Sequence, residues 1–166
     1  MSVTATLDSF LHNKHCTYDT VSHYPSRSAT ESALLAAVPL KQVVKAVLLQ
    51  DHHKHYTLAA VPSMYKVMLP QIEAITGQRL QLADEDEVFR IFGDCAPGAI
   101  PALGQAYGVN VVCDDALLNE NDLYIEAGDH NLLVHLNHEQ FTELMAQQPH
   151  GDISCAPEQL HDLTHF

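Results

Sequence analysis

The sequence of 166 residues contains no tryptophan, no CxxC pair among its four cysteines, and no Lys or Arg after Arg90. A chain of this length can bury enough apolar surface to fold without disulfides or a structural metal, so we expect reduced thiols. No run approaches the roughly 18 apolar residues of a membrane helix, and no basic segment followed by an apolar stretch opens the chain. We therefore expect one soluble, cytoplasmic domain spanning residues 1–166, with no membrane partner.

The missing basic residues make the charge distribution uneven. Residues 1–90 carry nine acidic and eight basic side chains, whereas residues 91–166 carry twelve acidic side chains and no basic one, for a net charge of -13. Phosphate contacts supply most non-specific affinity for nucleic acid, and they require Lys or Arg. The sequence therefore argues against DNA binding, and it predicts that any nucleic-acid substrate is held by a few local contacts in the N-terminal half.

The apolar residues that are present predict alternating helices and strands. We predict helices at 4–14, 30–39, 69–76, 84–92 and 138–146, and strands at 18–22, 42–49, 56–61, 79–82, 109–113, 123–126 and 132–136. The polar segment DHHKH is expected to form an exposed turn between the antiparallel strands 42–49 and 56–61. Residues 147–166 are interpreted as a polar C-terminal tail. The fold class is mixed α/β, of the α+β type.

Lys45 interrupts the otherwise apolar strand 42–49, in which Val43, Val47 and Leu49 share its face. An unpaired buried ammonium is costly, so this lysine must reach a cleft, an anion or the surface. A functional lysine and a lysine that merely reaches water are equally compatible with this pattern.

Two further segments are candidates for chemistry. The loop 97–104 has Gly98 and Gly104 beside Pro97 and Pro101, and it could present fixed backbone N–H groups to a carbonyl or phosphate, or simply form a turn. The segment 128–130 is a polar hairpin turn in one interpretation, and in the other it places a histidine, His130, beside a cleft.

Twelve histidines suggest a third class of site, a metal centre at His52, His53 and His55. Residues two apart on an extended segment point the same way, but no carboxylate or cysteine completes a recognised ligand spacing, and HExxH is absent. We therefore predict no metal. Cys95 and Cys113 lack a nucleophile signature and are interpreted as buried thiols.

The order of these features resembles the YbaK-type aminoacyl-tRNA deacylases, the free-standing relatives of the prolyl-tRNA-synthetase-associated editing domain, over about residues 5–146. The matching stretches are SATESALLAAVP, QVVKAVLLQ followed by YTLAAVP, LQLADEDEV, PGAIPALGQAYGVNVVCDD and YIEAGDHNLLVHL. The resemblance implies a strongly curved mixed sheet covered by helices.

The resemblance also implies the site residues. The family's hallmark lysine corresponds to Lys45 and holds the 3′ end of the aminoacyl-tRNA, and a recurrent site histidine corresponds to His130. The family's pocket loop corresponds to residues 98–101. The catalytic residues would be Lys45, Gly98 and His130, and the substrate-binding residues Lys45, Ala99, Ile100, Pro101 and Asp129. The family loop is Gly-x-x-x-Pro, whereas two residues separate Gly98 from Pro101 here, so the amino acid that is removed does not follow from the resemblance.

The activity implied is hydrolysis, without a cofactor, of the ester that joins a mischarged small amino acid to tRNA. The first candidate is tRNA(Pro), and an aminoacyl-tRNA synthetase is a possible partner. An aminoacyl ester is already activated, so a positioned water and fixed N–H donors suffice for its hydrolysis. The alternative function is a non-catalytic module whose pocket senses an amino acid, a nucleotide or a protein partner; the acidic charge favours this reading modestly.

Overall fold

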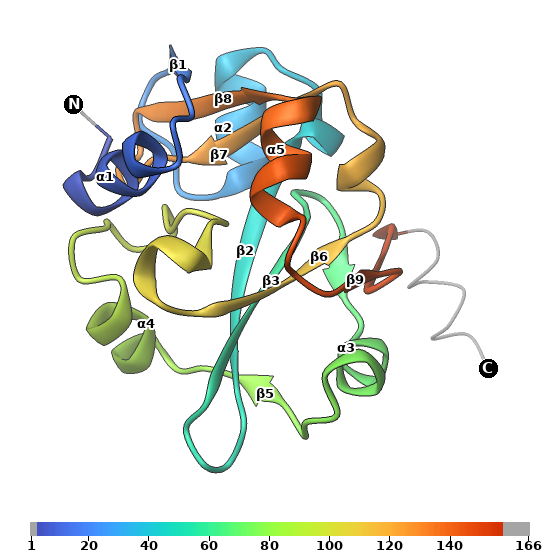
Figure 1. Ribbon diagram of the computed structural model, residues 1–166. Coiled ribbons are helices and arrows are strands. Elements are labelled where there is room, and N and C mark those ends of the chain that lie inside the picture. The colour runs from blue at the N-terminus through green and yellow to red at the C-terminus, as the bar shows by residue number, and fades with distance from the viewer. Residues whose placement is uncertain (1–2, 158–166) are drawn as a thin grey trace.

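A computed structural model of the protein describes residues 3–157 (Figure 1). The helices are α1 Ala5–Asn13, α2 Ala29–Ala36, α3 Leu69–Thr76, α4 Glu85–Ile91 and α5 His138–Met145, with short 3-10 segments η1 Leu40–Gln42, η2 Gly104–Tyr107 and η3 Leu117–Asn119. The strands are β1 Asp19–Ser22, β2 Val43–Gln50, β3 Tyr56–Pro62, β4 Lys66–Val67, β5 Gln81–Leu82, β6 Asn110–Asp114, β7 Asp122–Glu126, β8 Leu132–Asn137, β9 His150–Gly151 and β10 Ser154–Cys155.

The main sheet has the strand order β1-β8-β7-β2-β3-β6-β9, and β5 pairs with β2 beside this path. The pairs β1–β8, β8–β7, β2–β3 and β2–β5 are antiparallel, whereas β7–β2, β3–β6 and β6–β9 are parallel. The fold class predicted from the sequence is therefore confirmed.

The predicted hairpin is also confirmed, because β2 and β3 pair antiparallel from Val44 opposite Pro62 to Gln50 opposite Tyr56. The four turn residues after Asp51 are exposed as expected, but Asp51 itself is buried, which corrects the prediction that all of DHHKH is exposed. Its Oδ1 accepts hydrogen bonds from the backbone N–H groups of His53 and His55, at 2.8 and 2.9 Å. Asp51 turns inward because its carboxylate organises the turn.

One edge of β2 is shared between two strands that do not meet. β7 pairs with Val43 and Val44 at one end of β2, and β5 pairs with Leu49 and Gln50 at the other end. Within residues 3–157, the segment 45–48 has no ladder partner on this edge, although the Ala83 N–H donates to the Leu48 carbonyl at 3.0 Å. Figure 1 shows β7 and β5 at opposite ends of the long strand β2. An opening therefore interrupts the sheet beside β2.

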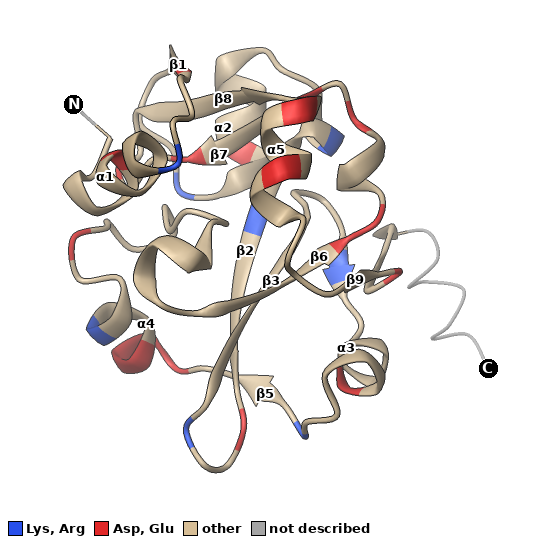
Figure 2. Ribbon diagram, in the orientation of Figure 1, with Lys and Arg blue, Asp and Glu red and all other residues tan. Residues whose placement is uncertain are grey.

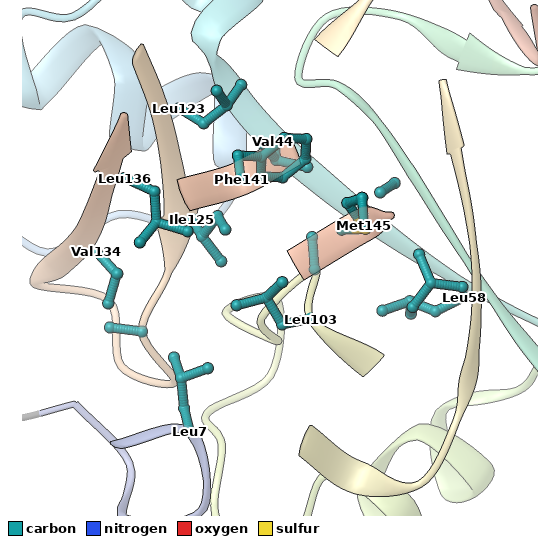
Figure 3. Close-up of a cluster of buried hydrophobic side chains, with 14 of the residues drawn as sticks. Leu7, Val44, Leu58, Leu103, Leu123, Ile125, Val134, Leu136, Phe141 and Met145 are labelled. Atoms are coloured by element: carbon teal, nitrogen blue, oxygen red, sulfur yellow. The ribbon is translucent and has the colours of Figure 1, made fainter. Parts of the chain in front are cut away.

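The largest core cluster lies on one face of the sheet, against α1, α5 and the chain around η2. Val44 and Leu48 of β2 contribute to it together with Phe141 and Met145 of α5, as Figure 3 shows for Val44, Phe141 and Met145. Phe141 is fully buried. This alternation along β2 places Val43, Lys45, Val47 and Leu49 on the opposite face.

The opposite face carries two smaller clusters instead of one. Ala29 and Ala33 of α2 pack on Val43, while Ile72 of α3 packs in a separate cluster that includes Leu49. Lys45 lies between these two clusters on β2. A lysine is tolerated in this strand because neither helix covers its position.

The sequence predicted no element after residue 148, but the structure forms two short strands there. β9 extends the main sheet beside β6, and β10 pairs with β4, a strand that the sequence also did not predict. Asp114 is buried and fixes this segment, since its Oδ2 accepts hydrogen bonds from Ser154 Oγ at 2.6 Å and from the Ile153 N–H at 3.1 Å. The remainder of the predicted tail, residues 158–166, lies outside the described residues. Among the described helices, none has the length and apolar composition needed to cross a bilayer.

We predict that Phe141→Ala lowers the free energy of unfolding by about 3–5 kcal/mol, because it leaves a cavity in the main core. The matched control is Phe89→Ala, whose side chain is 69% exposed and whose loss should cost less than about 0.5 kcal/mol. Urea denaturation of both variants measures the difference. Equal costs for the two substitutions would show that α5 does not carry the main core.

Candidate functional site

A cavity of about 240 Å³ occupies the opening beside β2. Its walls come from α2, from the segment 45–48 of β2, from Leu82 of β5, from α4, from the loop after α4 and from the end of β7. Three of the residues predicted from the sequence line it, namely Lys45, Gly98 and Ile100. Segments that are far apart in the sequence therefore meet at the interruption of the sheet.

Lys45 is half-buried in this cavity, and its Nζ donates a hydrogen bond to the backbone carbonyl of Tyr65. Burial lowers the pKa of the Lys45 ammonium, and the positive charge of Lys66 lowers it further. Figure 2 shows acidic segments on α4 and α5 and a basic segment within β2, where Lys45 is the sole Lys or Arg. The cavity therefore contains a cation in a chain whose net charge is -13.

Gly98 is at a position where a side chain cannot be accommodated. Its φ is +79°, and a Cβ atom built there would lie 2.9 Å from the Arg27 carbonyl oxygen. In the described part of the chain, the N–H groups of Gly98 and Ile100 make no hydrogen bond, whereas the Ala99 N–H donates to the Ala96 carbonyl at 3.1 Å. Gly98 and Ile100 can thus offer backbone donors to a ligand, while Ala99 is committed to the turn.

Ala99 and Pro101 are buried and do not line the cavity. Their burial anchors the loop in which Gly98 and Ile100 line the opening. Asp129 does not line the cavity either. Its Oδ1 accepts hydrogen bonds from the N–H groups of Asn131 and Leu132, at 2.8 and 3.0 Å, and so closes the turn between β7 and β8.

His130 follows Asp129 in this turn and lies against the glycine loop. Its Cε1 is 3.6 Å from the position that a Cβ of Gly98 would take, and its carbonyl accepts a hydrogen bond from the Ser26 N–H at 3.1 Å. The Nδ1 of His130 is buried and has no partner in the described part of the chain. The structure thus brings His130 to the loop behind the cavity rather than to its lining.

Gly128 joins this loop to the start of the chain. Its carbonyl accepts a hydrogen bond from the Ala96 N–H at 2.7 Å, and the neighbouring Ala127 carbonyl accepts one from the Thr4 N–H at 3.0 Å. A Cβ atom on Gly128, whose φ is +98°, would lie 2.0 Å from Thr4 Cγ2. Only glycine allows Thr4, which caps the N-terminus of α1, to approach so closely.

Among the lining residues that sequence reasoning missed is a buried carboxyl group, that of Glu126 at the end of β7. Glu126 is 2% exposed, and burial raises its pKa to about 7. Ser32 Oγ donates to its Oε1 at 2.7 Å and thereby lowers the pKa, whereas the charge of Asp129 raises it. The available signal was an acidic residue at the end of an apolar strand, a pattern that usually indicates a side chain reaching water.

A larger cavity, of about 460 Å³, lies between α1 and α5, and none of the sequence-predicted site residues lines it. Cys16 is its only thiol among the described residues. Partial burial, and then the charge of Glu143, raises the pKa of that thiol, which makes it a poor nucleophile. We place the candidate site at the smaller cavity, because it contains a lysine and a carboxyl group whose pKa values are both shifted.

Cys95, Cys113 and the histidine cluster do not line this cavity. Cys95 and Cys113 are buried free thiols, and burial is the main cause that raises the pKa of each to about 12. His52, His53 and His55 are exposed at the turn after β2. Residues 3–157 contain no group of three or more His, Cys, Asp or Glu side chains arranged to hold a metal ion.

Comparisons with solved structures show where this fold occurs. A crystal structure of a hypothetical protein superposes with a TM-score of 0.80 at 20% identity, covering 90% of this chain and 99% of that one. A crystal structure described as a candidate trans-editing enzyme for prolyl-tRNA synthetase superposes with a TM-score of 0.76 at 19% identity, covering 91% and 96%. At these identities the likeness establishes the fold.

A third structure places the same fold inside a longer chain. It is described as a candidate signal transduction protein from Marinobacter aquaeolei VT8, with a TM-score of 0.75 at 17% identity, covering 99% of this chain and 37% of that one. No curated protein sequence matches this chain. The sequence profile of the family described as aminoacyl-tRNA editing domain matches residues 23–144, which include every residue of the candidate site. The chain belongs to the aminoacyl-tRNA editing domain family.

Proposed function

We propose that this protein is a deacylase that acts in trans and hydrolyses the ester between a mischarged small amino acid and its tRNA. The observation that carries the proposal is the composition of the cavity. It joins Lys45 to the free N–H groups of Gly98 and Ile100, and its described lining contains no Cys, Ser or Thr. A site with N–H donors and a cation but no hydroxyl or thiol group suits attack by water on an activated ester.

In the proposed reaction, water adds to the ester carbonyl carbon, and the bond from that carbon to the ribose oxygen breaks. The N–H groups of Gly98 and Ile100 stabilise the negative charge that develops on the carbonyl oxygen. The ribose oxygen takes up a proton, and the products are a free amino acid and tRNA. The proton taken up by the ribose oxygen comes from the attacking water. His130 does not line the cavity and its Nδ1 is buried, so we assign it a positioning role behind the loop that contains Gly98.

The proposed substrate follows from size and charge. A volume of about 240 Å³ is below the roughly 300–1,000 Å³ typical of pockets for drug-sized ligands, and it suits a small aminoacyl group. Lys45 and the neighbouring Lys66 provide positive charge for the phosphate at the acceptor end of tRNA. We propose tRNA(Pro) as the first substrate to test, because one structural relative is described as a candidate trans-editing enzyme for prolyl-tRNA synthetase.

A panel of purified aminoacyl-tRNAs, each incubated with the protein, tests the proposal. Release of amino acid from at least one mischarged species is expected, together with sparing of the correctly charged species. If the protein binds an amino acid or nucleotide but releases no amino acid from any aminoacyl-tRNA of the panel, it is instead a non-catalytic binding module. The acidic charge, and the relative in which this fold is 37% of a longer chain described as a candidate signal transduction protein, are the observations that favour this second function.

We predict that Lys45→Ala lowers kcat/KM for deacylation by roughly 10- to 100-fold, the range expected for a lost hydrogen bond to a charged group. Lys45→Arg should restore activity only in part, because a guanidinium is larger and planar. The thermal midpoint should stay the same or rise, since burial disfavours the ammonium in the folded state.

The matched control is Lys54→Ala, at the exposed turn of the same hairpin, where the ion pair with Glu87 contributes little. Activity unchanged in Lys45→Ala would refute the role of this lysine. A large fall in its thermal midpoint would show that the lysine is structural.

We also predict that Gly98→Ala lowers kcat/KM more than Gly77→Ala does. Both glycines have a positive φ, +79° and +72°, so both substitutions introduce similar backbone strain. A Cβ at Gly98 meets the Arg27 carbonyl, whereas a Cβ at Gly77 has no atom within 4 Å. Thermal melts of the two variants measure the cost of the backbone strain that both share. Steady-state kinetics then show the additional loss of activity that displacement of the Gly98 loop causes. Equal losses of activity at equal stability would contradict the role of the Gly98 loop.

A further inference from the structure

Glu126 brings an unused acceptor into the cavity. Its Oε1 accepts the hydrogen bond from Ser32 Oγ, but its Oε2 is buried and has no partner within residues 3–157. Ser32 Oγ is itself 2.6 Å from Ser26 Oγ, and because Ser32 donates to Glu126, the Ser26 hydroxyl donates to Ser32. The Ser26 and Ser32 hydroxyl groups thus hold Oε1 in place, while Oε2 is left without a hydrogen-bond donor. A buried carboxyl oxygen without a partner is costly unless a ligand satisfies it.

The lysine of the cavity does not satisfy it. In the parallel pairing of β2 with β7, Val44 lies opposite Ile125. Lys45 follows Val44 and Glu126 follows Ile125, so their side chains project from the same face of the sheet. No ion pair joins Lys45 to Glu126 within 4.0 Å, since the Lys45 ammonium bonds to the Tyr65 carbonyl instead. Tyr65 follows β3, which lies on the other side of β2 from β7.

The cavity is therefore electrically polar. Its anionic end is Glu126, with the like charge of Asp129 near it, and its cationic end is Lys45, with the like charge of Lys66 near it. The like charge beside each end opposes ionisation of that end, so a ligand group of opposite charge relieves it, and the two ends do not neutralise each other. Such a cavity favours a ligand that carries a cation and an anion some distance apart.

We propose that Glu126 binds the α-ammonium group of the aminoacyl moiety through Oε2. The inference rests on the proposed function, because an aminoacyl-tRNA has an ammonium beside its ester carbonyl and a phosphate beyond the ribose. The ammonium then lies at the anionic end, the phosphate lies toward Lys45, and the ester carbonyl lies between them, where Gly98 and Ile100 present their N–H groups. Ser32 and Ser26 are positioning residues that orient the carboxyl group.

This assignment predicts a chemical selectivity for a free amino group. Acetylation of the α-amine removes its charge and leaves the ester, the side chain and the tRNA unchanged. The wild-type protein should therefore hydrolyse a free aminoacyl-tRNA faster than its N-acetyl form by roughly 10- to 100-fold, the range expected for a hydrogen bond to a charged group. Each enzymatic rate is divided by the spontaneous hydrolysis rate of the same ester, because acetylation also changes its intrinsic reactivity.

The experiment compares both esters with the wild type, Glu126→Gln, Ser32→Ala and Glu85→Gln. Glu126→Gln keeps the shape of the side chain but removes its charge. The variant should lose kcat/KM for the free aminoacyl-tRNA and not for the N-acetyl form, so that the two rates come within a few-fold of each other. Ser32→Ala should reduce the selectivity in part. Glu85 lines the same cavity but is exposed, so Glu85→Gln should change the selectivity by less than about 5-fold.

The outcomes separate the two proposals. Wild-type activity with equal losses on both esters in Glu126→Gln would overturn the ammonium assignment and leave the deacylase function standing. No wild-type turnover of any aminoacyl-tRNA would overturn the function and the assignment together. A thermal midpoint of Glu126→Gln equal to or above that of the wild type is expected, since a neutral amide is less costly to bury than a carboxylate.

Discussion

Backbone pairing along one edge of β2 stops for four residues between β7 and β5, and the candidate site depends on this interruption. An unpaired strand edge normally attracts further strands and is a liability in a folded protein. Here the edge faces inward, where α2, α4 and the loop after α4 surround it. The interruption therefore creates a lined cavity at the centre of a sheet that is otherwise continuous.

The same interruption explains why two ionisable side chains are found beside apolar clusters. On the face of Lys45 the core is split between α2 and α3, so the strand passes from one cluster to the other through a gap that can accept a lysine. Glu126 ends β7 at the other side of this gap. Both groups lose solvation there, which lowers the pKa of Lys45 and raises the pKa of Glu126. Each ionised group therefore gains from a ligand that carries the opposite charge.

Local sequence patterns predicted the parts of the site that are local. The apolar strand with its lysine, the hairpin after it and the loop rich in glycine and proline were all recognisable within a few residues. The interruption of the sheet could not be predicted in this way. It depends on the pairing of β2 with Tyr124 of β7 and with Leu82 of β5, and no pattern within β2 encodes those partners. Glu126 was missed because its burial results from packing against α2. The strands after residue 148 were missed for the same reason, since Asp114 on β6 fixes them.

The contact of Gly128 with Thr4 has a practical consequence for handling the protein. Through the Ala127 and Gly128 carbonyls, one short stretch of backbone holds both the cap of α1 and the start of the loop that contains Gly98. A purification tag, cloning scar or proteolytic cut close to Thr4 therefore disturbs the backbone that also positions the Gly98 loop of the cavity. Recombinant protein intended for kinetic work should therefore leave Thr4 and its neighbouring residues unaltered, and a tag fused next to them should be removed before rates are compared.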